Sequence, residues 1–177
     1  MLFYIIVIGL GVIFLVFFTL LLINGYKLKS LNIRIEEAEN DVSETLKEKH
    51  ALLTSIDSIM KSKDKDDLFQ GLDTININDL NNIELNKELS KYDKVIVELT
   101  DYNKEIVYDD DEQQIFESLA KTNIDRLAIE KYYNDNVTKY NKLLNTFPSS
   151  IIARFRDYNK KELFKNEKEE IFEILKK

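Results

Sequence analysis

The first 26 residues of the chain carry no charged side chain, and from Leu2 to Ile23 all but four positions are apolar. At about 1.5 Å of rise per residue, a helix over these positions is about 33 Å long, which matches the roughly 30 Å hydrocarbon core of a bilayer. A cleaved signal peptide would begin with a basic segment and end at a small-residue site, and neither is present. We therefore expect residues 1–26 to form a retained transmembrane anchor that contacts the lipid bilayer through Leu2–Ile23. A cleaved signal peptide and a buried core helix are the alternatives.

Basic residues lie on one side of this anchor only. Lys27, Lys29 and Arg34 follow it, whereas no Lys or Arg precedes it. The positive-inside rule places the flank richer in Lys and Arg in the cytoplasm. The sequence therefore predicts a single-pass protein of the cell membrane, with its N-terminus outside and the rest of the chain cytoplasmic.

The composition favours long helices and narrows the classes of function. Only 4 Gly and 1 Pro occur in 177 residues, so helix-breaking residues are rare. A net charge of −7 argues against nucleic acid as a partner, because phosphate binding needs a basic surface. The chain has no Cys and a single His, His50, so we expect no thiol catalysis, no metal site and no cofactor.

An apolar stripe with helical spacing follows the anchor. Its members recur at steps of three and four residues, the a/d pattern of a coiled coil, and Lys49 occupies the one slot that is skipped. The stripe consists of Leu28, Leu31, Ile35, Ala38, Val42, Leu46, Leu53, Ile56 and Met60. The spacing predicts that the anchor and the stripe form one helix of about 60 residues, at about 1.5 Å of rise per residue. Such a helix buries its stripe only against partner helices, from the same chain or from another.

A polar stretch at residues 61–82 interrupts this pattern. It predicts a connection with one short helical turn around Leu68–Leu72. A second stripe with helical spacing follows the connection, and Asn103 holds one of its slots. This stripe consists of Leu85, Leu89, Tyr92, Ile96, Leu99 and Ile106. It predicts a second helical region.

An acidic run from Asp109 to Glu112 precedes the third predicted helix. Negative side chains stabilise the positive end of a helix dipole, so the run predicts a helix start. A calcium site is the alternative, but the run lacks the ligand spacing of an EF-hand loop. The helix is expected from about Glu112 to Thr146, and to end near Pro148 because Pro restricts the residue before it.

The end of the chain predicts an amphipathic tail helix. Apolar residues recur on a Lys/Glu background from Lys160 to Lys177. Ser149 or Ser150 is expected to cap the helix that follows Pro148. The tail helix is expected to pack on the helical bundle, with an anionic membrane surface as the alternative.

A repeated Tyr-Asn pair is the most informative constellation in the chain. It comprises Tyr133, Asn134, Val137, Tyr140 and Asn141, and its two pairs are seven residues apart, on nearly the same helix face. One interpretation is a partly polar seam, in which the rings pack between helices, the amide and hydroxyl groups satisfy one another, and the Tyr140 hydroxyl end stays wet. The other is a recognition strip for a partner. Neither supplies a nucleophile–base pair, so no catalytic residue is predicted.

The chain resembles the LemA family of small bacterial membrane proteins. The resemblance begins with Asn24-Gly25-Tyr26-Lys27-Leu28 after the apolar segment and with the Glu37-Ala38 pair. Its most specific part is the pattern YN-x2-V-x2-YN…FP-x2-I-x-A, which the chain reproduces from Tyr133 to Ala153, and Phe164 corresponds to a terminal Phe of the family. The resemblance implies an antiparallel helical bundle on a membrane anchor, without an established enzymatic activity.

Together these features predict an all-α fold, with an N-terminal transmembrane helix followed by an antiparallel three-to-four-helix bundle. The expected division is an anchor at 1–26, a LemA-like bundle at 27–150 and a tail helix at 151–177. The expected function is that of a membrane-tethered, non-enzymatic interaction or scaffold protein, which binds an unknown protein partner or another copy of itself. The alternative is a membrane-bound sensor or enzyme with a small-ligand site inside the bundle.

Overall fold

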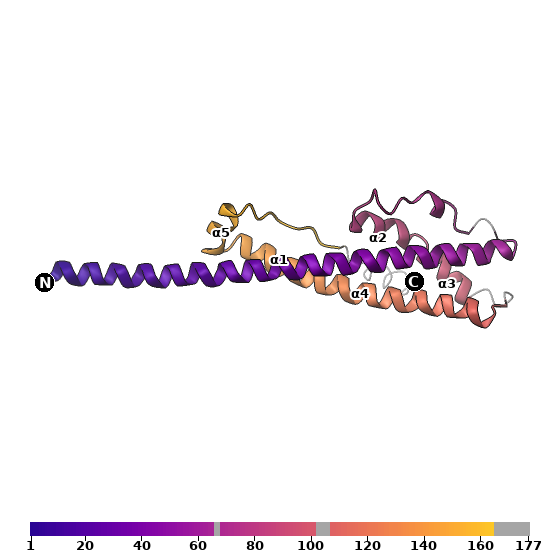
Figure 1. Ribbon diagram of the computed structural model, residues 1–177, viewed down its shortest axis with the longest axis horizontal. Coiled ribbons are helices and arrows are strands. Elements are labelled where there is room, and N and C mark those ends of the chain that lie inside the picture. Colours follow the sequence, from indigo (N-terminus) through magenta and orange to yellow (C-terminus); the bar gives the residue numbers. More distant parts are fainter. Residues whose placement is uncertain (66–67, 102–106, 165–177) are drawn as a thin grey trace, which may run out of the picture. The chain divides into compact units, whose positions relative to one another are not determined.

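A computed structural model describes residues 1–65, 68–101 and 107–164 (Figure 1). These ranges contain helices and turns and no strand, so the predicted all-α fold class is confirmed. The helices are α1 (Leu2–Ser62), the 3₁₀-helix η1 (Leu72–Thr74), α2 (Asn82–Ser90), α3 (Asp93–Asp101), α4 (Asp110–Leu144) and α5 (Ser149–Phe155).

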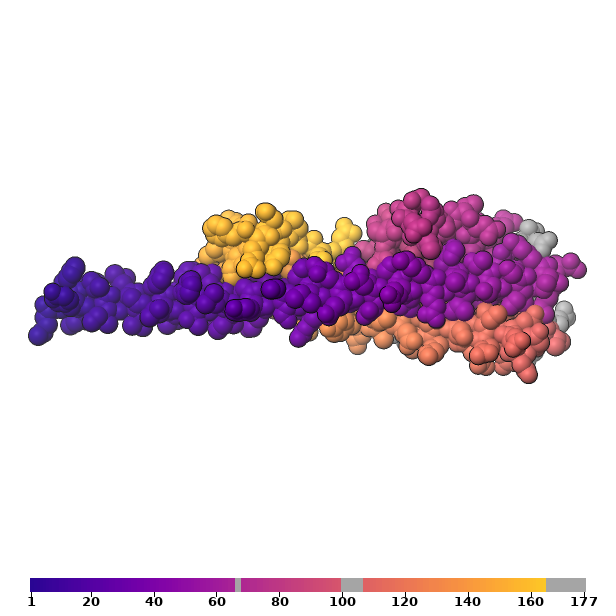
Figure 2. All heavy atoms as spheres, viewed as in Figure 1, coloured from indigo at the N-terminus to yellow at the C-terminus, as the bar shows by residue number. Residues whose placement is uncertain are grey.

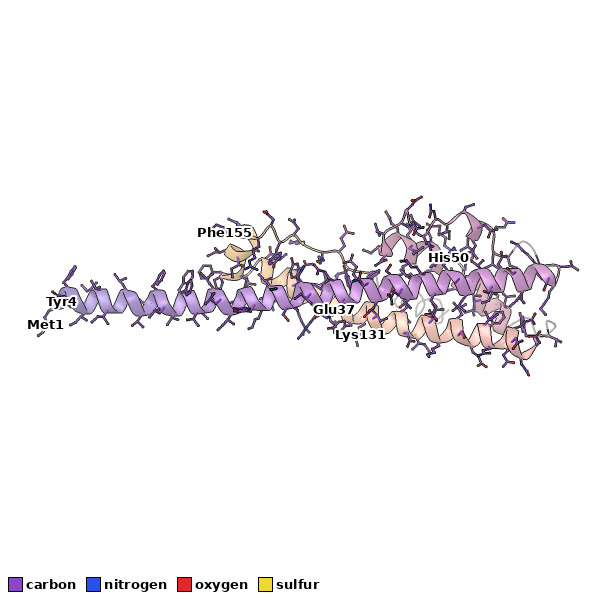
Figure 3. All side chains as sticks on the ribbon, viewed as in Figure 1. Met1, Tyr4, Glu37, His50, Lys131 and Phe155 are labelled. Atoms are coloured by element: carbon purple, nitrogen blue, oxygen red, sulfur yellow. The ribbon has the colours of Figure 1, made fainter. Side chains whose placement is uncertain are left out.

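The chain forms two compact units, and the long helices α1 and α4 each contribute residues to both. Unit 1 comprises Met1–Glu37 and Tyr132–Lys177, and unit 2 comprises Ala38–Lys131. Glu37 and Lys131, which are labelled in Figure 3, mark the last residue before each boundary. The predicted functional division at residues 26 and 150 stays a prediction.

Helix α1 runs without a break from the apolar N-terminal segment through the stripe, as predicted. Every residue from 1 to 16 is exposed, and Figure 2 shows this end of the helix uncovered on the visible face. By length and composition this helix is able to cross a membrane. Helix α1 ends at Ser62. Asp64, two residues later, has a φ of 58° in the left-handed region, and the Lys65 N–H donates to the Met60 carbonyl at 3.0 Å. This is the Schellman geometry that satisfies the last carbonyls of a helix.

The predicted stripe of α1 is buried by other parts of the same chain. Eight of its nine members are at most 1% exposed: Leu28, Ile35, Ala38, Val42, Leu46, Leu53, Ile56 and Met60. Leu31 is half-buried. The a/d spacing therefore marks an intramolecular helix interface.

In unit 2 the second stripe forms two helices, α2 and α3, rather than one continuous helix. The chain breaks between them at Lys91 and Tyr92. Contacts with distant residues hold this break, because the Tyr92 ring stacks on Phe69 at 5.8 Å and its hydroxyl donates to the Gln70 carbonyl at 3.0 Å. Asn103 and Ile106, which the stripe includes, lie outside the described residues.

The connection before α2 consists mainly of turns, and its short helical segment is η1, which begins where the predicted turn at Leu68–Leu72 was expected to end. Helix α2 begins with a capping box, in which the Asn81 side chain accepts from the Glu84 N–H and the Glu84 carboxylate accepts from the Asn81 N–H. The polar Asn residues of this stretch thus define a helix start.

The acidic run starts α4, as predicted. The Glu112 N–H donates to the Asp109 carboxylate at 2.8 Å, and the Asp109 N–H donates to the Glu112 carboxylate at 3.1 Å. These two bonds are again a capping box, which accounts for the acidic residues structurally. Helix α4 ends at Leu144, two residues before the predicted end.

The prediction that Ser149 or Ser150 caps the next helix is wrong. Pro148 occupies the N-cap position of α5 without a side-chain cap, while the Ser149 hydroxyl donates to Asn24 Oδ1 at 3.1 Å. A contact between distant segments has taken the hydroxyl that local capping would have used. Helix α5 ends at Phe155; Asp157 then has a φ of 51°, and the Tyr158 N–H donates to the Ala153 carbonyl at 3.0 Å.

The chain after α5 is not helical as far as it is described. Residues 158–164 have no regular secondary structure, so the tail helix expected from Lys160 does not begin there. The remainder of that predicted helix, residues 165–177, lies outside the described residues. The physical reason is that the backbone of this stretch hydrogen-bonds to side chains of α4 instead of to itself.

Candidate functional site

The apolar members of the Tyr-Asn strip lie in the core of unit 1. Tyr133 is 5% exposed, Tyr140 1% and Val137 0%. Tyr140 therefore keeps less contact with solvent than the seam interpretation predicts. Burial raises the pKa of the Tyr140 hydroxyl, and the nearby Tyr158 and Glu36 add to the rise. These three residues anchor the strip in the core.

The two asparagines of the strip bind the backbone of the C-terminal segment. Asn134 Nδ2 donates to the Phe164 carbonyl at 3.0 Å, and the Phe164 N–H donates to Asn134 Oδ1 at 2.9 Å. Asn141, seven residues after Asn134 on α4, makes the same pair of bonds. It donates to the Lys161 carbonyl at 2.8 Å and accepts from the Lys161 N–H at 3.0 Å. We call this pair of side chains, Asn134 and Asn141, the asparagine clamp.

The spacing of the clamp matches the spacing of an extended chain. Seven residues of α-helix rise about 10.5 Å, and three residues of extended backbone cover about 10 Å. Asn134 and Asn141 are seven residues apart, and their backbone partners Phe164 and Lys161 are three apart. The higher-numbered asparagine holds the lower-numbered residue, so the segment runs antiparallel to α4.

The two tyrosines of the strip contact the same segment through their rings. The Tyr133 ring meets Phe164 edge to face at 5.0 Å, and its hydroxyl donates to the Glu162 carbonyl at 3.1 Å. Tyr140 meets Tyr158 edge to face at 6.1 Å. Phe164 is 4% exposed, whereas Leu163 is 47% exposed, so the strip encloses one aromatic side chain and leaves its neighbour outside.

The strip thus combines features of both sequence interpretations. Its rings are packed, as in a seam, but its amides do not satisfy one another. They pair with peptide groups about 20 to 30 residues further along the chain. The arrangement can recognise a peptide backbone, and it offers no group arranged for covalent chemistry.

A second cluster in unit 1 joins α5 to the apolar end of α1. Phe147 stacks on Phe17 at 5.7 Å, beside the hydrogen bond between Ser149 and Asn24. Phe147 is nevertheless 67% exposed, and Phe155, which is labelled in Figure 3, is 85% exposed. The sequence did not indicate this cluster, although Asn24 and Phe147 both belong to the pattern that resembles the LemA family.

Unit 2 contains buried charged groups that the sequence did not single out. Arg126 is 3% exposed, donates to Glu130 at 2.6 Å and donates to Asn86 Oδ1 at 2.7 Å. Lys49, in the skipped slot of the α1 stripe, is fully buried and pairs with Asp93 at 2.7 Å. A charge in an apolar stripe was the one available signal for this ion pair.

His50 lies next to Lys49 on α1 and is half-buried (Figure 3). Its Nε2 atom is buried without a hydrogen-bond partner. Across residues 1–65, 68–101 and 107–164 no group of three or more His, Asp or Glu side chains is placed to hold a metal ion.

The fold and the site define a small helical-bundle protein with a long apolar N-terminal helix and a Tyr-Asn repeat that closes on the chain's own C-terminal segment. The model of the LemA family matches residues 76–174, more than half of the chain, and the chain belongs to this family. No curated protein and no solved structure matches it.

Proposed function

We propose that the chain is a membrane-tethered, non-enzymatic interaction protein of the LemA type, and that the Tyr-Asn face of α4 is its interaction surface. This proposal is carried by the asparagine clamp, in which two side-chain amides hold an extended backbone. Helix faces that bind other helices use apolar ridges, whereas paired amides present the donors and acceptors of a strand edge.

The tether in this proposal is the apolar segment at residues 2–23, which spans the bilayer. Its exposed, uncharged side chains support this role. The contact between Phe17 and Phe147 supports it independently. Phe17 lies six residues before the end of the segment, which is about 9 Å along a helix. In the proposed bilayer the exposed ring of Phe147, which stacks on Phe17, would therefore contact lipid. Arg156 lines a surface pocket with Tyr26 and Lys29, just after the apolar segment, where the proposal places the headgroups.

The absence of Trp from the chain allows a direct test of this depth. A Phe147→Trp variant, reconstituted in vesicles, carries a single Trp. We expect blue-shifted emission that is quenched by lipids brominated in the acyl chains. Tyr132→Trp, at a 48% exposed position of α4, is the matched control and should stay red-shifted and unquenched. Equal quenching of both variants, or of neither, would remove the support for membrane contact.

The orientation in this proposal places the bundle in the cytoplasm, since Lys27, Lys29 and Arg34 follow the anchor. The chain has no Cys, so Ser62→Cys introduces a single thiol at the exposed end of α1. A membrane-impermeant maleimide should label this thiol only after the cells are permeabilised. Labelling in intact cells would reverse the orientation.

The interaction surface is tested by cross-linking in membranes that contain the full chain. A photoreactive residue at the exposed position 135 lies next to the clamp. We expect cross-linked products from the wild type that disappear when Asn134 and Asn141 are both replaced by Ala, at unchanged helix content. Asn145→Ala is the matched control, because Asn145 is an exposed asparagine directly after the end of α4 whose amide donates to the Asn141 backbone carbonyl and not to the clamped segment. Identical products from all three chains would contradict the proposed surface and would favour the alternative, a small-ligand site inside the bundle.

A further inference from the structure

We infer that the asparagine clamp is a peptide-binding site, that its ligand is an extended peptide with an aromatic side chain at one fixed position, and that residues 161–164 of the chain occupy it as an internal ligand. This inference rests on the proposed function, in which the Tyr-Asn face is the interaction surface. It adds that the partner is an extended peptide with an aromatic side chain, and that this peptide must displace residues 161–164.

The conformation of the ligand follows from the hydrogen bonds. Each clamp asparagine donates to a carbonyl and accepts from the N–H of the same residue, Phe164 for Asn134 and Lys161 for Asn141. A residue inside a helix has both groups engaged within the helix, so it cannot bind in this way. Peptides that add a strand to a sheet edge are recognised by the same pairing, with affinity from the main chain and specificity from side-chain pockets. The clamp therefore selects extended backbone.

The sequence preference of the site follows from burial. Phe164 is 4% exposed against the Tyr133 ring, whereas Glu162 and Leu163 are exposed. The Tyr133 hydroxyl contacts position 162 through its backbone carbonyl, which every residue type has. The site therefore selects an aromatic side chain at the position of Phe164, three residues after Lys161, and tolerates different side chains at the two positions between them.

The internal segment is suited to exchange with an external peptide. Its clamp contacts are hydrogen bonds to two half-buried side chains, together with one enclosed ring. Asp157, two residues after the end of α5, has a left-handed conformation and lies only four residues before Lys161. The short connection keeps the segment close to the clamp at a high effective concentration. An external peptide has to overcome this competition, so weakening the internal ligand should open the site.

The test uses the full chain in detergent micelles and a fluorescent peptide with the sequence of residues 158–164. Phe164→Ala removes the enclosed ring from the internal ligand without changing α4. We expect the peptide to bind this variant at least about tenfold more tightly than the wild type, and binding to fall by about tenfold or more when Asn134→Ala and Asn141→Ala are added.

Peptide chemistry provides a second, independent readout. N-methylation at the Phe of the peptide removes the N–H that donates to Asn134, and we expect about tenfold weaker binding. N-methylation at the preceding Leu is the matched control, because in the described part of the chain the Leu163 N–H makes no hydrogen bond to α4, and it should leave affinity nearly unchanged. Replacing the Phe of the peptide by Ala should weaken binding further than either methylation.

Several results would overturn the inference. These are absence of peptide binding to the Phe164→Ala chain, binding that is indifferent to the two asparagines, and equal effects of the two methylations. A concentration-dependent dimer that Phe164→Ala abolishes would assign the site to a second copy instead of a partner peptide. If the peptide binds as expected while membrane cross-links ignore the clamp, the proposed function fails and the peptide site stands. If the membrane cross-links depend on the clamp but the peptide does not bind, the proposed interaction surface stands and the inference of a peptide ligand fails.

Discussion

Helix α4 carries polar side chains with defined partners in both units of the molecule, but the chemistry differs. In unit 2 a buried charged group, Arg126, donates to the carboxylate of Glu130 and to the amide oxygen of Asn86. In unit 1 the half-buried neutral amides of Asn134 and Asn141 bind peptide groups. Each arrangement lies within one unit.

The difference is the one expected if the ion pair of unit 2 stabilises a single structure and the amides of unit 1 serve the proposed peptide binding. A buried ion pair has lost its hydration, so it tolerates the loss of neither partner. An amide that binds backbone depends on chain conformation and not on side-chain identity, and its partners can return to water at a small cost. The buried charges of unit 2 thus fit a structural role, and the half-buried amides of unit 1 fit the proposed role in recognition.

The largest expected effect comes from placing a charge in the clamp unit. Val137→Asp puts a carboxylate at a position that is 0% exposed, between the two tyrosines. We expect a loss of about 5 kcal/mol in the free energy of unfolding, enough to unfold a domain of ordinary stability. Thermal unfolding followed by circular dichroism measures this effect. An unchanged melting temperature would show that the strip is a surface and would break its assignment to the core.

In unit 2, Arg126→Met should reduce the free energy of unfolding by about 3–5 kcal/mol, because it removes the positive charge that faces the buried Glu130 carboxylate. The double variant Arg126→Met/Glu130→Leu should recover most of this loss, since it removes both charges. Denaturant unfolding of the three chains measures the difference. If the double variant is as unstable as the single one, the cost belongs to packing and the contrast between the units weakens.

The fold could be predicted from the sequence where apolar spacing decides it. The α1 stripe, the acidic start of α4 and its end before Pro148 follow from periodicity and local capping. The break between α2 and α3 could not be predicted, because Tyr92 is held by residues that lie more than 20 positions away. The spacing of apolar residues indicates which side chains share a face of one helix, but it carries no information about contacts with distant parts of the chain.

The sequence indicated the helix face that carries the asparagine clamp but not the chain segment that the clamp binds. The repeat at Tyr133 and Tyr140 identified the helix face, yet nothing local indicates that Lys161 and Phe164 return to it. Amphipathic spacing after Lys160 suggested a helix instead, because the same apolar residues suit either conformation. Side-chain amides on α4 decide between the two by taking the backbone hydrogen bonds.

A smaller effect is expected from opening the clamp itself. Replacing Asn134 and Asn141 together by Ala should cost only about 1–2 kcal/mol, since the released peptide groups regain water. Helix content should stay constant while the segment after α5 becomes sensitive to protease. Asn145→Ala controls for the loss of an exposed asparagine directly after α4 that does not bind the segment. A loss as large as that of Arg126→Met would contradict the contrast between the two units.

The smallest expected effect is a pH dependence in unit 1. Burial raises the folded pKa of Tyr140 above its ordinary value. Above pH 10 the unfolded chain therefore binds fewer protons than the folded one, and stability falls as the pH rises through the folded pKa. Tyr140→Phe should make this fall shallower, by at most about 1.4 kcal/mol per pH unit. Unfolding of both chains at pH 9 and pH 11 measures the difference, and parallel curves would contradict burial of this hydroxyl.

The most direct measurement is amide hydrogen exchange at residues 161–164 of the full chain, resolved by NMR in micelles. The clamp engages the N–H groups of Lys161 and Phe164. These two amides should therefore exchange at least about tenfold more slowly than those of Glu162 and Leu163, and the alternation should vanish in the Asn134→Ala/Asn141→Ala chain. Uniformly fast exchange in the wild type, or protection of all four amides as in a helix, would contradict the asparagine clamp.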